Sequence, residues 1–302
     1  MSLLISVVIC SYNREKYISS ALYSLLTQTL SKTLFEILVV DNNSTDNTAV
    51  VCQQIITANP HYNIQYITEE KQGASFARNT GAARALGKLL VFMDDDAVAE
   101  KDFLTQVARF HEQHPRIAGF GGRIIPRYIP AEPQWMSHWV ASLVGNFDYA
   151  PQTAEFSWNR YPLESNMVVT KKAFDSIGGF STTLPGVQGT LRIGGEGKDF
   201  FMRLKANGYR VYYVPNMVVH HVVEVSKLTP DYMYRVASGI GRGERLRIGS
   251  GNWNFIKKLM EYLYKLAGAV VIAVGYALAG KSAKSWPVIQ FRIDALKGFL
   301  GK

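Results

Sequence analysis

Short apolar runs alternate with segments of helical periodicity through the first hundred residues, and this alternation restricts the chain to few folds. The apolar runs cover 4–10, 36–40, 64–67 and 89–93. Between them lie segments with helical spacing at 17–30 and 50–56 and a small-residue segment at 74–86. Because strands that alternate with helices build a largely parallel sheet with helices on both faces, the sequence predicts an α/β fold.

Polar residues directly follow three of these apolar runs. Ser11, Asn13 and Arg14 follow the first run, Asp41 follows the second, and Asp94-Asp95-Asp96 follows the fourth. In an open α/β sheet, ligands bind outside the carboxyl ends of the strands. The sequence therefore predicts a ligand site at this edge of the sheet.

The three consecutive carboxylates at 94–96 carry the strongest chemical signal. Adjacent carboxylates repel one another unless a cation is present. Oxygen ligands suit Mg²⁺ and Mn²⁺, which also bind phosphate oxygens. The triplet thus predicts a divalent-metal site, and a solvated acidic turn is the alternative.

Two further segments are suited to a nucleotide. Asp41 could accept a hydrogen bond from a base edge, while Ser44 and Asp46 resemble the entry to the next helix. Gly73 precedes a predicted helix start, where backbone N–H groups can approach an anion. Arg78 adds a planar donor for a diphosphate or a base, although close packing of a small-residue helix also explains this segment.

These segments together resemble the family 2 glycosyltransferases with the GT-A fold. The resemblance rests on Ser-Tyr-Asn-Arg at 11–14, Val-Val-Asp-Asn-Asn-Ser-Thr-Asp at 39–46, Gly-Ala-Ser-Phe-Ala-Arg-Asn-Thr-Gly at 73–81, Phe-Met-Asp-Asp-Asp at 92–96, and Asn-Met at 166–167 followed by Gly-Gly-Phe at 178–180. The motifs occur in the family's order and cover roughly residues 4–225. The resemblance implies a Rossmann-like α/β/α sandwich with a mostly parallel central sheet.

The resemblance also implies an inverting transfer from a nucleotide-sugar, favouring a UDP-sugar, to a glycan or lipid-linked acceptor. The expected nucleotide-binding residues are Ser11, Asn13, Arg14, Asp41, Ala74, Arg78, Asp94 and Asp95. The expected ligands of Mn²⁺ or Mg²⁺ are Asp96, Asp94 and His221. The expected acceptor-binding residues are Glu164, Asn166 and Trp158.

The segment for the general base departs from the family pattern. The family usually has Gly-Glu-Asp there, and this chain has Gly195-Glu196-Gly197, followed two residues later by Asp199. Gly197 has no side chain that could accept a proton. Glu196 is favoured as the base, with Asp199 orienting or substituting for it, although Asp199 could instead cap the following helix.

Two short strands, at 210–214 and 217–223, are expected around Pro215. The adjacent residues His220 and His221 should point to opposite faces of the second strand.

The positive charge of the chain lies almost entirely in its last quarter. Residues 1–230 hold 21 Lys+Arg and 20 Asp+Glu, whereas residues 231–302 hold 12 and 4. Such asymmetry predicts contact with an anionic surface. The resemblance assigns the near-neutral part to a nucleotide-sugar, so we expect an anionic membrane and no nucleic acid as the partner of the tail.

Residues 266–280 contain no charged side chain. A helix of that length spans about 22 Å, less than the roughly 30 Å of a bilayer core. A helix that lies on the membrane or re-enters it is favoured, while a transmembrane or a buried core helix stays open. The Gly-rich run at 239–243 is expected to form a basic loop, and the phosphate-loop-like pattern at 275–282 is better explained as helix because no strand precedes it.

The sequence also predicts where the protein works and how it is divided. Two cysteines in apolar segments and no basic residue before the first apolar run predict a reducing, cytoplasmic location without a signal peptide, at the inner face of the plasma membrane. The predicted domains are 1–225, with a nucleotide half at 1–100 and an acceptor half at 101–225 that includes an insert at 126–162, and a helical extension at 226–302. Two other functions stay open: a sugar nucleotidyltransferase, and a non-catalytic membrane-binding protein.

Overall fold

The computed structural model describes residues 3–188, 191–249 and 251–301, and the chain divides into two compact units. Unit 1 consists of Met1–Ile125, Phe147–Thr183 and Gly197–Val222. Unit 2 consists of Pro126–Asn146, Leu184–Glu196 and Val223–Lys302. Each unit therefore combines segments that are far apart in the sequence. The domain boundary near residue 225 stays a prediction.

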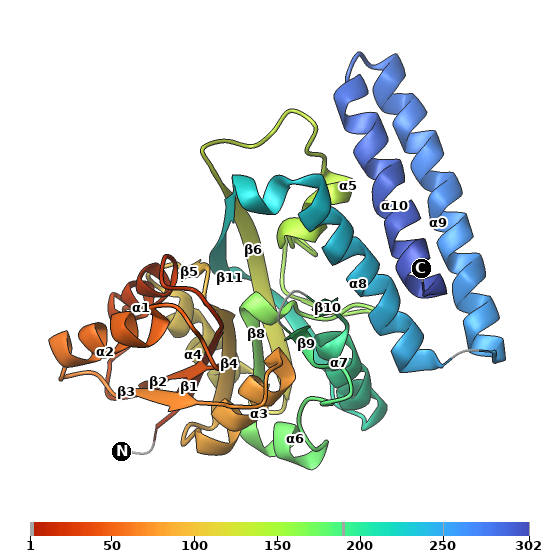
Figure 1. The fold of residues 1–302 in the computed structure, drawn as a ribbon. Helices are drawn as coiled ribbons and strands as arrows, with labels where there is room; N and C mark the ends of the chain where they lie inside the picture. Colours follow the sequence, from red (N-terminus) through yellow and green to blue (C-terminus); the bar gives the residue numbers. More distant parts are fainter. Residues whose placement is uncertain (1–2, 189–190, 250, 302) are drawn as a thin grey trace. The chain divides into compact units, whose positions relative to one another are not determined.

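Four parallel strands form one half of the sheet in unit 1 (Figure 1). They are β1 (Ile5–Ser11), β2 (Phe35–Asp41), β3 (Ile64–Thr68) and β4 (Leu89–Asp94), in the order β3-β2-β1-β4. The helices between them are α1 (Ile18–Leu26), α2 (Thr48–Ala58) and α3 (Ala74–Arg84). All seven elements lie within a few residues of the predicted segments.

The other half of the sheet is mixed. It continues from β4 through β8 (Met167–Thr170), β6 (Gly119–Ile129), β11 (Val211–Glu224) and β5 (Ala97–Ala99), and β7 (Ala154–Glu155) pairs with β11. β8 is antiparallel to both β4 and β6, and β11 is antiparallel to β5 and β7. The predicted α/β fold is confirmed.

Side chains that alternate along the strands supply two apolar cores, one on each face of this sheet. Ile5, Val7 and Ile9 of β1 are in the core with α1, α2 and α4 (Phe103–Gln113). Val8 is in the other core with α3, α6 (Lys171–Ser176) and α7 (Glu196–Ala206). The alternation follows from the two-residue period of a strand, and it explains why these runs read as continuously apolar.

Two predicted elements of unit 1 differ from the structure. The two short strands expected around Pro215 are one strand, β11. Pro215 lies between the residues paired with β7 and those paired with β5, and proline is tolerated in a strand where its missing N–H is not needed. The helix that Asp199 could have capped begins at Glu196, so Asp199 lies inside its first turn and is not its cap.

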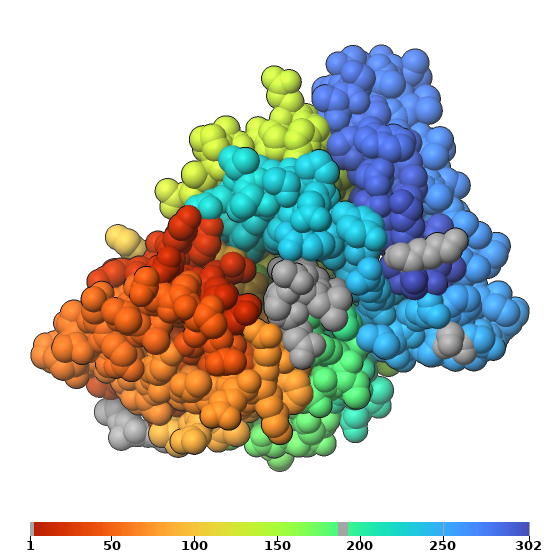
Figure 2. All heavy atoms as spheres, in the orientation of Figure 1, coloured from red at the N-terminus to blue at the C-terminus, as the bar shows by residue number. Residues whose placement is uncertain are grey.

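Unit 2 consists mainly of three long helices, α8 (Pro230–Ile248), α9 (Trp253–Leu278) and α10 (Ser285–Leu300). The short α5 (His138–Ala141), the strand pair β9 (Gly186–Gln188) and β10 (Leu191–Ile193), and the 3₁₀ turns η1 (Ser142–Val144), η3 (Val225–Leu228) and η4 (Ser282–Lys284) complete it. α9 and α10 form a hairpin, drawn in two shades of blue in Figure 2. Phe299 of α10 stacks on Phe255 and lies against Tyr262 of α9, with ring centres 4.7 and 5.0 Å apart.

The glycine-rich run at 239–243 lies inside α8, so the prediction of a basic loop is wrong. The glycines permit close packing. A Cβ on Gly241 would lie 2.0 Å from the carbonyl oxygen of Ala295 in α10, and a Cβ on Gly298 would lie 2.0 Å from the carbonyl oxygen of Ser238. The run is therefore a helix contact surface, and the 275–282 pattern falls, as expected, at a helix end without a preceding strand.

We expect Gly241→Ala to lower the free energy of unfolding by about 1–3 kcal/mol, because the added methyl group overpacks the α8–α10 contact. Gly275→Ala in α9 is the matched control, since nothing lies within 4 Å of its added Cβ. Replacing this helix glycine with alanine should raise the free energy of unfolding by about 0.5–1 kcal/mol. Denaturant unfolding of the two variants measures both values, and equal stability would contradict the packing argument.

Candidate active site

The register of the parallel strands brings the polar strand ends of unit 1 to one edge. Ser11 pairs with Asp41 across β1 and β2, and Cys10 pairs with Asp94 across β1 and β4. Three segments that are far apart in the sequence therefore end at the same level. This is the edge at which the sequence predicted a ligand site.

Hydrogen bonds join the turn after β2 to the turn after β1. The Oδ1 atom of Asn13 accepts a hydrogen bond from the backbone N–H of Thr45 at 2.8 Å, and the N–H of Asn13 donates to the Ser44 hydroxyl at 2.9 Å. Asp41 accepts from the backbone N–H of Ser44 at 3.0 Å and from the Tyr66 hydroxyl. The carboxylate of Asp41 is thereby fixed in direction at the strand end.

The start of α3 is held by a side chain that the sequence reasoning did not single out. Asn42 accepts from the backbone N–H of Gly73 at 2.6 Å and donates to the carbonyl oxygen of Lys71 at 2.8 Å. Gly73 has a φ of 142°, which disfavours any residue with a Cβ. Ala74 is the first residue of α3.

Arg78 of α3 is buried beside the acidic triplet. Its guanidinium carbon lies 5.5 Å from the ring centre of Phe180, and its Nη2 lies 3.9 Å from Oδ1 of Asp94. The aromatic contact and the confinement by burial hold the planar group in one orientation. Its positive charge thus lies next to the end of β4.

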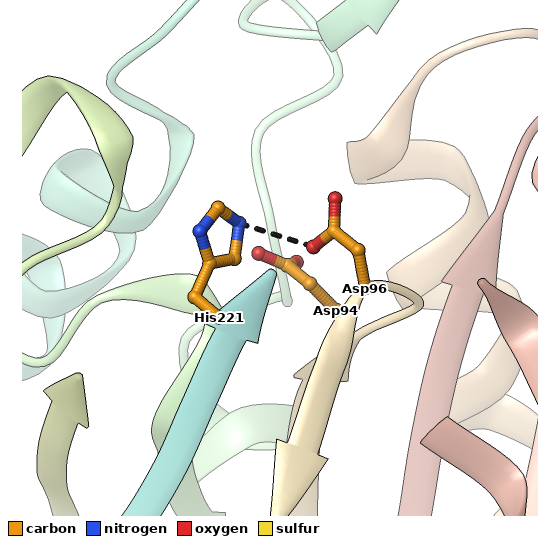
Figure 3. Close-up of side chains that lie close together, drawn as sticks. All are labelled: Asp94, Asp96 and His221. Carbon is orange, nitrogen blue, oxygen red and sulfur yellow. Dashed lines mark ion pairs between the residues drawn. The ribbon is translucent and has the colours of Figure 1, made fainter. Parts of the chain in front are cut away.

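Asp94, Asp96 and His221 form a compact group of potential metal ligands (Figure 3). One ligand atom of each lies within 4.8 Å of the others, and Nε2 of His221 is 3.0 Å from Oδ1 of Asp96. Asp96 and His221 are buried, whereas the Asp94 side chain is 36% exposed. The backbone N–H of Val222 donates to the carbonyl oxygen of Asp96 at 2.9 Å, which ties β11 to the triplet.

The middle carboxylate of the triplet lies apart from this group. Asp95 is buried, and its Oδ1 accepts from Nε of Arg14 at 3.2 Å. Burial raises the pKa of Asp95 to about 7, against the opposing effect of Arg14. Ser11 is also buried at this edge. Within the triplet, Asp94 and Asp96 thus lie beside His221, whereas Asp95 lies beside Arg14.

The two adjacent histidines of β11 have different partners. His220 is 2.6 Å from Oε1 of Glu100, and its side chain is 31% exposed. His221 faces Asp96 and is buried. Only one of the two joins the acidic group, as the alternation along a strand predicts.

The residues predicted to bind the acceptor lie in three different environments. Ser165, which the sequence reasoning gave no role, donates its hydroxyl to Asp94 from the 3₁₀ turn η2 (Glu164–Asn166). Asn166 is fully buried, and its amide donates to the carbonyl oxygens of Arg123 at 3.0 Å and Met217 at 2.8 Å. Trp158 is 59% exposed. Their contact with an acceptor stays a prediction.

The two predicted candidates for the base are on α7. Oδ2 of Asp199 accepts from Nε of Arg203 at 2.8 Å, and Arg203 also donates to the carbonyl oxygens of Ile177 and Gly179, each at 2.7 Å. This network ties Asp199 to the Gly-Gly-Phe segment. Glu196 is buried at the first position of the helix. The catalytic role of either residue stays a prediction.

A sequence can reveal some of the missed residues and not others. Tyr66 could be found from the pairing of adjacent strands. It pairs with Val39 of β2, which lies two positions before Asp41 on the same strand. Ser165 is adjacent to two predicted site residues. Asn42 lies within the motif at 39–46, but its contacts could not be predicted, because they join backbone segments that meet only in the folded chain.

A sheet with a parallel half, and an Asp-Asp-His group at the carboxyl edge of its parallel strands, fits a GT-A type glycosyltransferase. The family model "Glycosyl transferase family 2" matches residues 6–182, more than half of the chain. The chain therefore belongs to glycosyltransferase family 2, and the predicted family and enzyme class are confirmed.

Two curated relatives act on dolichyl-linked sugars, as their names state. The dolichyl N-acetyl-alpha-D-glucosaminyl phosphate 3-beta-D-2,3-diacetamido-2,3-dideoxy-beta-D-glucuronosyltransferase of Methanococcus voltae is 28% identical over 83% of this chain and 77% of its own length. The glucosyl-dolichyl phosphate glucuronosyltransferase of Haloferax volcanii is 27% identical over 72% and 68%.

Solved structures share the fold at lower identity. The mannosyltransferase PcManGT from Pyrobaculum calidifontis, in complex with GDP-Man and Mn²⁺, is 18% identical with a TM-score of 0.68, over 99% of this chain and 88% of its own. Residues 1–349 of S. aureus TarS, in complex with UDP-GlcNAc, are 18% identical with a TM-score of 0.55, over 99% and 93%. This chain covers 41% of a longer TarS chain.

Proposed function

We propose that this glycosyltransferase moves a sugar, with inversion, from a UDP-sugar to a hydroxyl of a lipid-linked or polysaccharide acceptor. The observation that carries the proposal is the convergence of Asp94, Asp96 and His221 at the carboxyl edge of the parallel strands. The names of the two dolichyl-linked relatives support a lipid-linked acceptor. The TarS complex supports a uridine donor, and the PcManGT complex makes guanosine the alternative.

The donor set fits a divalent cation. Two carboxylate oxygens suit Mg²⁺ and Mn²⁺, and the imidazole nitrogen suits a transition metal, which favours Mn²⁺. Asp96, Asp94 and His221 would hold the ion, which when bound would neutralise the charge that develops on the leaving diphosphate. Arg78 supplies a second positive charge beside Asp94.

The remaining residues at this edge would position the nucleotide. Asp41, held by Ser44 and Tyr66, presents a carboxylate that could accept from the base. The backbone N–H of Ala74, at the start of α3, can donate to a phosphate oxygen. Asn13 would act mainly by fixing the turn that carries Asp41.

The direct test is a panel of nucleotide-sugars incubated with the protein, with and without Mn²⁺, and with a dolichyl-linked or polyprenyl-linked glycan as acceptor. We expect UDP release that requires the metal and rises with acceptor. Pyrophosphate release from a nucleoside triphosphate and a sugar phosphate would instead indicate a nucleotidyltransferase. Nucleotide binding without turnover of any donor would indicate a non-catalytic cleft.

The adjacent histidines provide a matched pair of variants. We expect His221→Asn to weaken Mn²⁺ binding at least about tenfold, since it removes one proposed ligand and its contact with Asp96. His220→Asn removes only an exposed pair with Glu100, which is worth about 0–1 kcal/mol, and should leave Mn²⁺ affinity unchanged. Isothermal titration with Mn²⁺ measures both, and equal losses would exclude His221 as a specific ligand.

We also propose that α9 lies on an anionic membrane surface. α9 is the one helix among the described residues that is long and apolar enough to cross a bilayer. Its apolar side chains also cover the face opposite Tyr262, Ala269 and Ala273, which are buried in the hairpin. The exposed apolar residues are Trp253, Ile256, Met260, Leu263, Tyr264, Val270, Val271, Val274 and Leu278.

The lysines near this face favour a position in the membrane surface. Lys257 and Lys265 lie on the first half of α9, and Lys281 and Lys284 follow its end. Basic side chains on both sides of an apolar helix attract anionic lipid headgroups. The acceptor lipid would then reach the enzyme at the cytoplasmic face of the membrane.

A further inference from the structure

The backbone of Gly197, in the first turn of α7, contacts the carboxylate of Glu164. The N–H of Gly197 donates to Oε1 of Glu164 at 3.1 Å. A Cβ at position 197 would lie 2.1 Å from that Oε1 and 2.7 Å from the carboxyl carbon. The Glu164 carboxylate therefore occupies the space that a side chain at 197 would enter, and the two positions cannot both carry extended side chains in this conformation.

Glu164 is connected to the Asp-Asp-His group through its neighbour in the chain, Ser165. It is half-buried in η2, and the next residue, Ser165, donates its hydroxyl to Asp94. The N–H of Gly197 and the amino end of an eleven-residue helix both stabilise a negative charge at this point. Glu164 is thus an oriented carboxylate whose neighbour touches a residue of the proposed donor site.

Several other carboxylates near this edge have contacts within the proposed metal site or with arginines. Asp94 and Asp96 belong to the proposed metal site, and Asp95 contacts Arg14. Asp199 is bound by Arg203, which is itself fixed by two backbone carbonyls. A proton acceptor must carry a carboxylate that can meet a hydroxyl of the acceptor. The Glu164 carboxylate lies where a side chain at position 197, the usual acidic position of the family pattern, would enter.

We propose that Glu164 is the general base of the transfer, in the space left by the absent side chain of Gly197; this rests on the function proposed above. One Oε atom takes the proton of the acceptor hydroxyl as its oxygen bonds to the anomeric carbon of the donor. The bond from that carbon to the diphosphate oxygen breaks, and its electron pair leaves with the nucleoside diphosphate. Glu164 ends the step as a neutral carboxylic acid and returns the proton to water.

The first test is Glu164→Gln, which preserves an oxygen for the N–H of Gly197 and removes the basicity. We expect kcat for transfer to fall about 10²–10⁴-fold, with Mn²⁺ and nucleotide affinity and thermal stability unchanged. The acidic limb of the pH profile of kcat/KM should also disappear. Transfer at the wild-type rate with an unchanged pH profile would overturn the proposal.

The second test moves the carboxylate from position 164 to position 197. Gly197→Asp alone should lose transfer, because its Cβ meets Glu164, and Glu164→Ala alone should lose it for lack of a base. The double variant Glu164→Ala/Gly197→Asp removes the obstruction and restores a carboxylate, so its transfer rate should exceed that of either single variant. Additive losses in the double variant, with nucleotide binding intact, would contradict an exchangeable base.

Two comparisons separate this inference from the proposed function. If the unaltered protein releases no nucleotide from any donor, both the proposed function and this inference are wrong. If the unaltered protein transfers sugar while Glu196→Gln or Asp199→Asn abolishes transfer and Glu164→Gln does not, only the inference fails. Loss in Glu164→Gln with near-normal turnover in the other two supports it.

Discussion

Replacing Asp96 with asparagine is expected to reduce sugar transfer about 10³-fold, equivalent to about 4 kcal/mol of transition-state stabilisation. Asp96 is 6% exposed and lies 3.0 Å from His221. The substitution removes the buried charge that the proposed metal site needs to compensate a cation. Transfer assays at saturating donor, over a range of Mn²⁺ concentrations, measure the loss.

The control for Asp96 is Asp175→Asn, which removes a carboxylate from the surface of the same unit. Its side chain is 58% exposed and pairs with Lys171 at 3.6 Å, so we expect no effect on transfer. Chelation of divalent ions with EDTA should reproduce the Asp96→Asn loss in the unaltered protein, and added Mn²⁺ should reverse it. Full activity of Asp96→Asn, or activity that survives chelation, would exclude the metal assignment.

Placing two glutamates on the exposed face of α9, Val271→Glu and Leu278→Glu, is expected to weaken binding to anionic vesicles at least about 100-fold. Burial of each apolar side chain is worth roughly 1.5–3 kcal/mol, and each factor of ten in affinity needs about 1.4 kcal/mol. Val271 and Leu278 are 73% and 84% exposed, so the helix hairpin should fold as before. Co-sedimentation with phosphatidylglycerol vesicles measures the loss.

Two exposed apolar residues of unit 1 provide the matched control. Val50 and Leu86 are 54% and 68% exposed, and Val50→Glu/Leu86→Glu adds the same charge away from α9. Vesicle binding should be retained. If the α9 variant binds vesicles as tightly as the unaltered protein, the membrane proposal is wrong. If it instead converts a dimer to a monomer without affecting vesicle binding, the apolar face is a contact between two copies of the chain.

The parallel half of the sheet was predictable because short, continuously apolar runs alternate there with segments of helical spacing. Each strand ended at the residue where the apolar run met a polar side chain, as at Ser11 and Asp41. Glycine and proline caused the errors. Their usual effect is to end regular structure, but at Pro215 the strand continues, and in α8 the glycines at 239–243 admit a neighbouring helix.

The composition of the candidate site was predictable from motifs, but the contacts that define its chemistry were not. The sequence placed Asp94, Asp96 and His221 together only through a family resemblance, since 125 positions separate Asp96 from His221. The replacement at Gly197 was visible as a departure from the family pattern. That Glu164 fills the resulting space depends on a packing distance, which no local pattern encodes.

The interleaved course of the chain has a consequence for its synthesis. Met136 and Val140 belong to the same apolar core of unit 2 as Phe291 and Phe299. Roughly 150 residues separate these partners, so at roughly 5–20 residues per second the ribosome delivers the second group roughly 8–30 s after the first. During that interval the early segment has no α10 to cover it. Nascent chains should therefore expose the apolar side chains of 136–144 during that interval, while unit 1 can begin to fold from its own N-terminal strands.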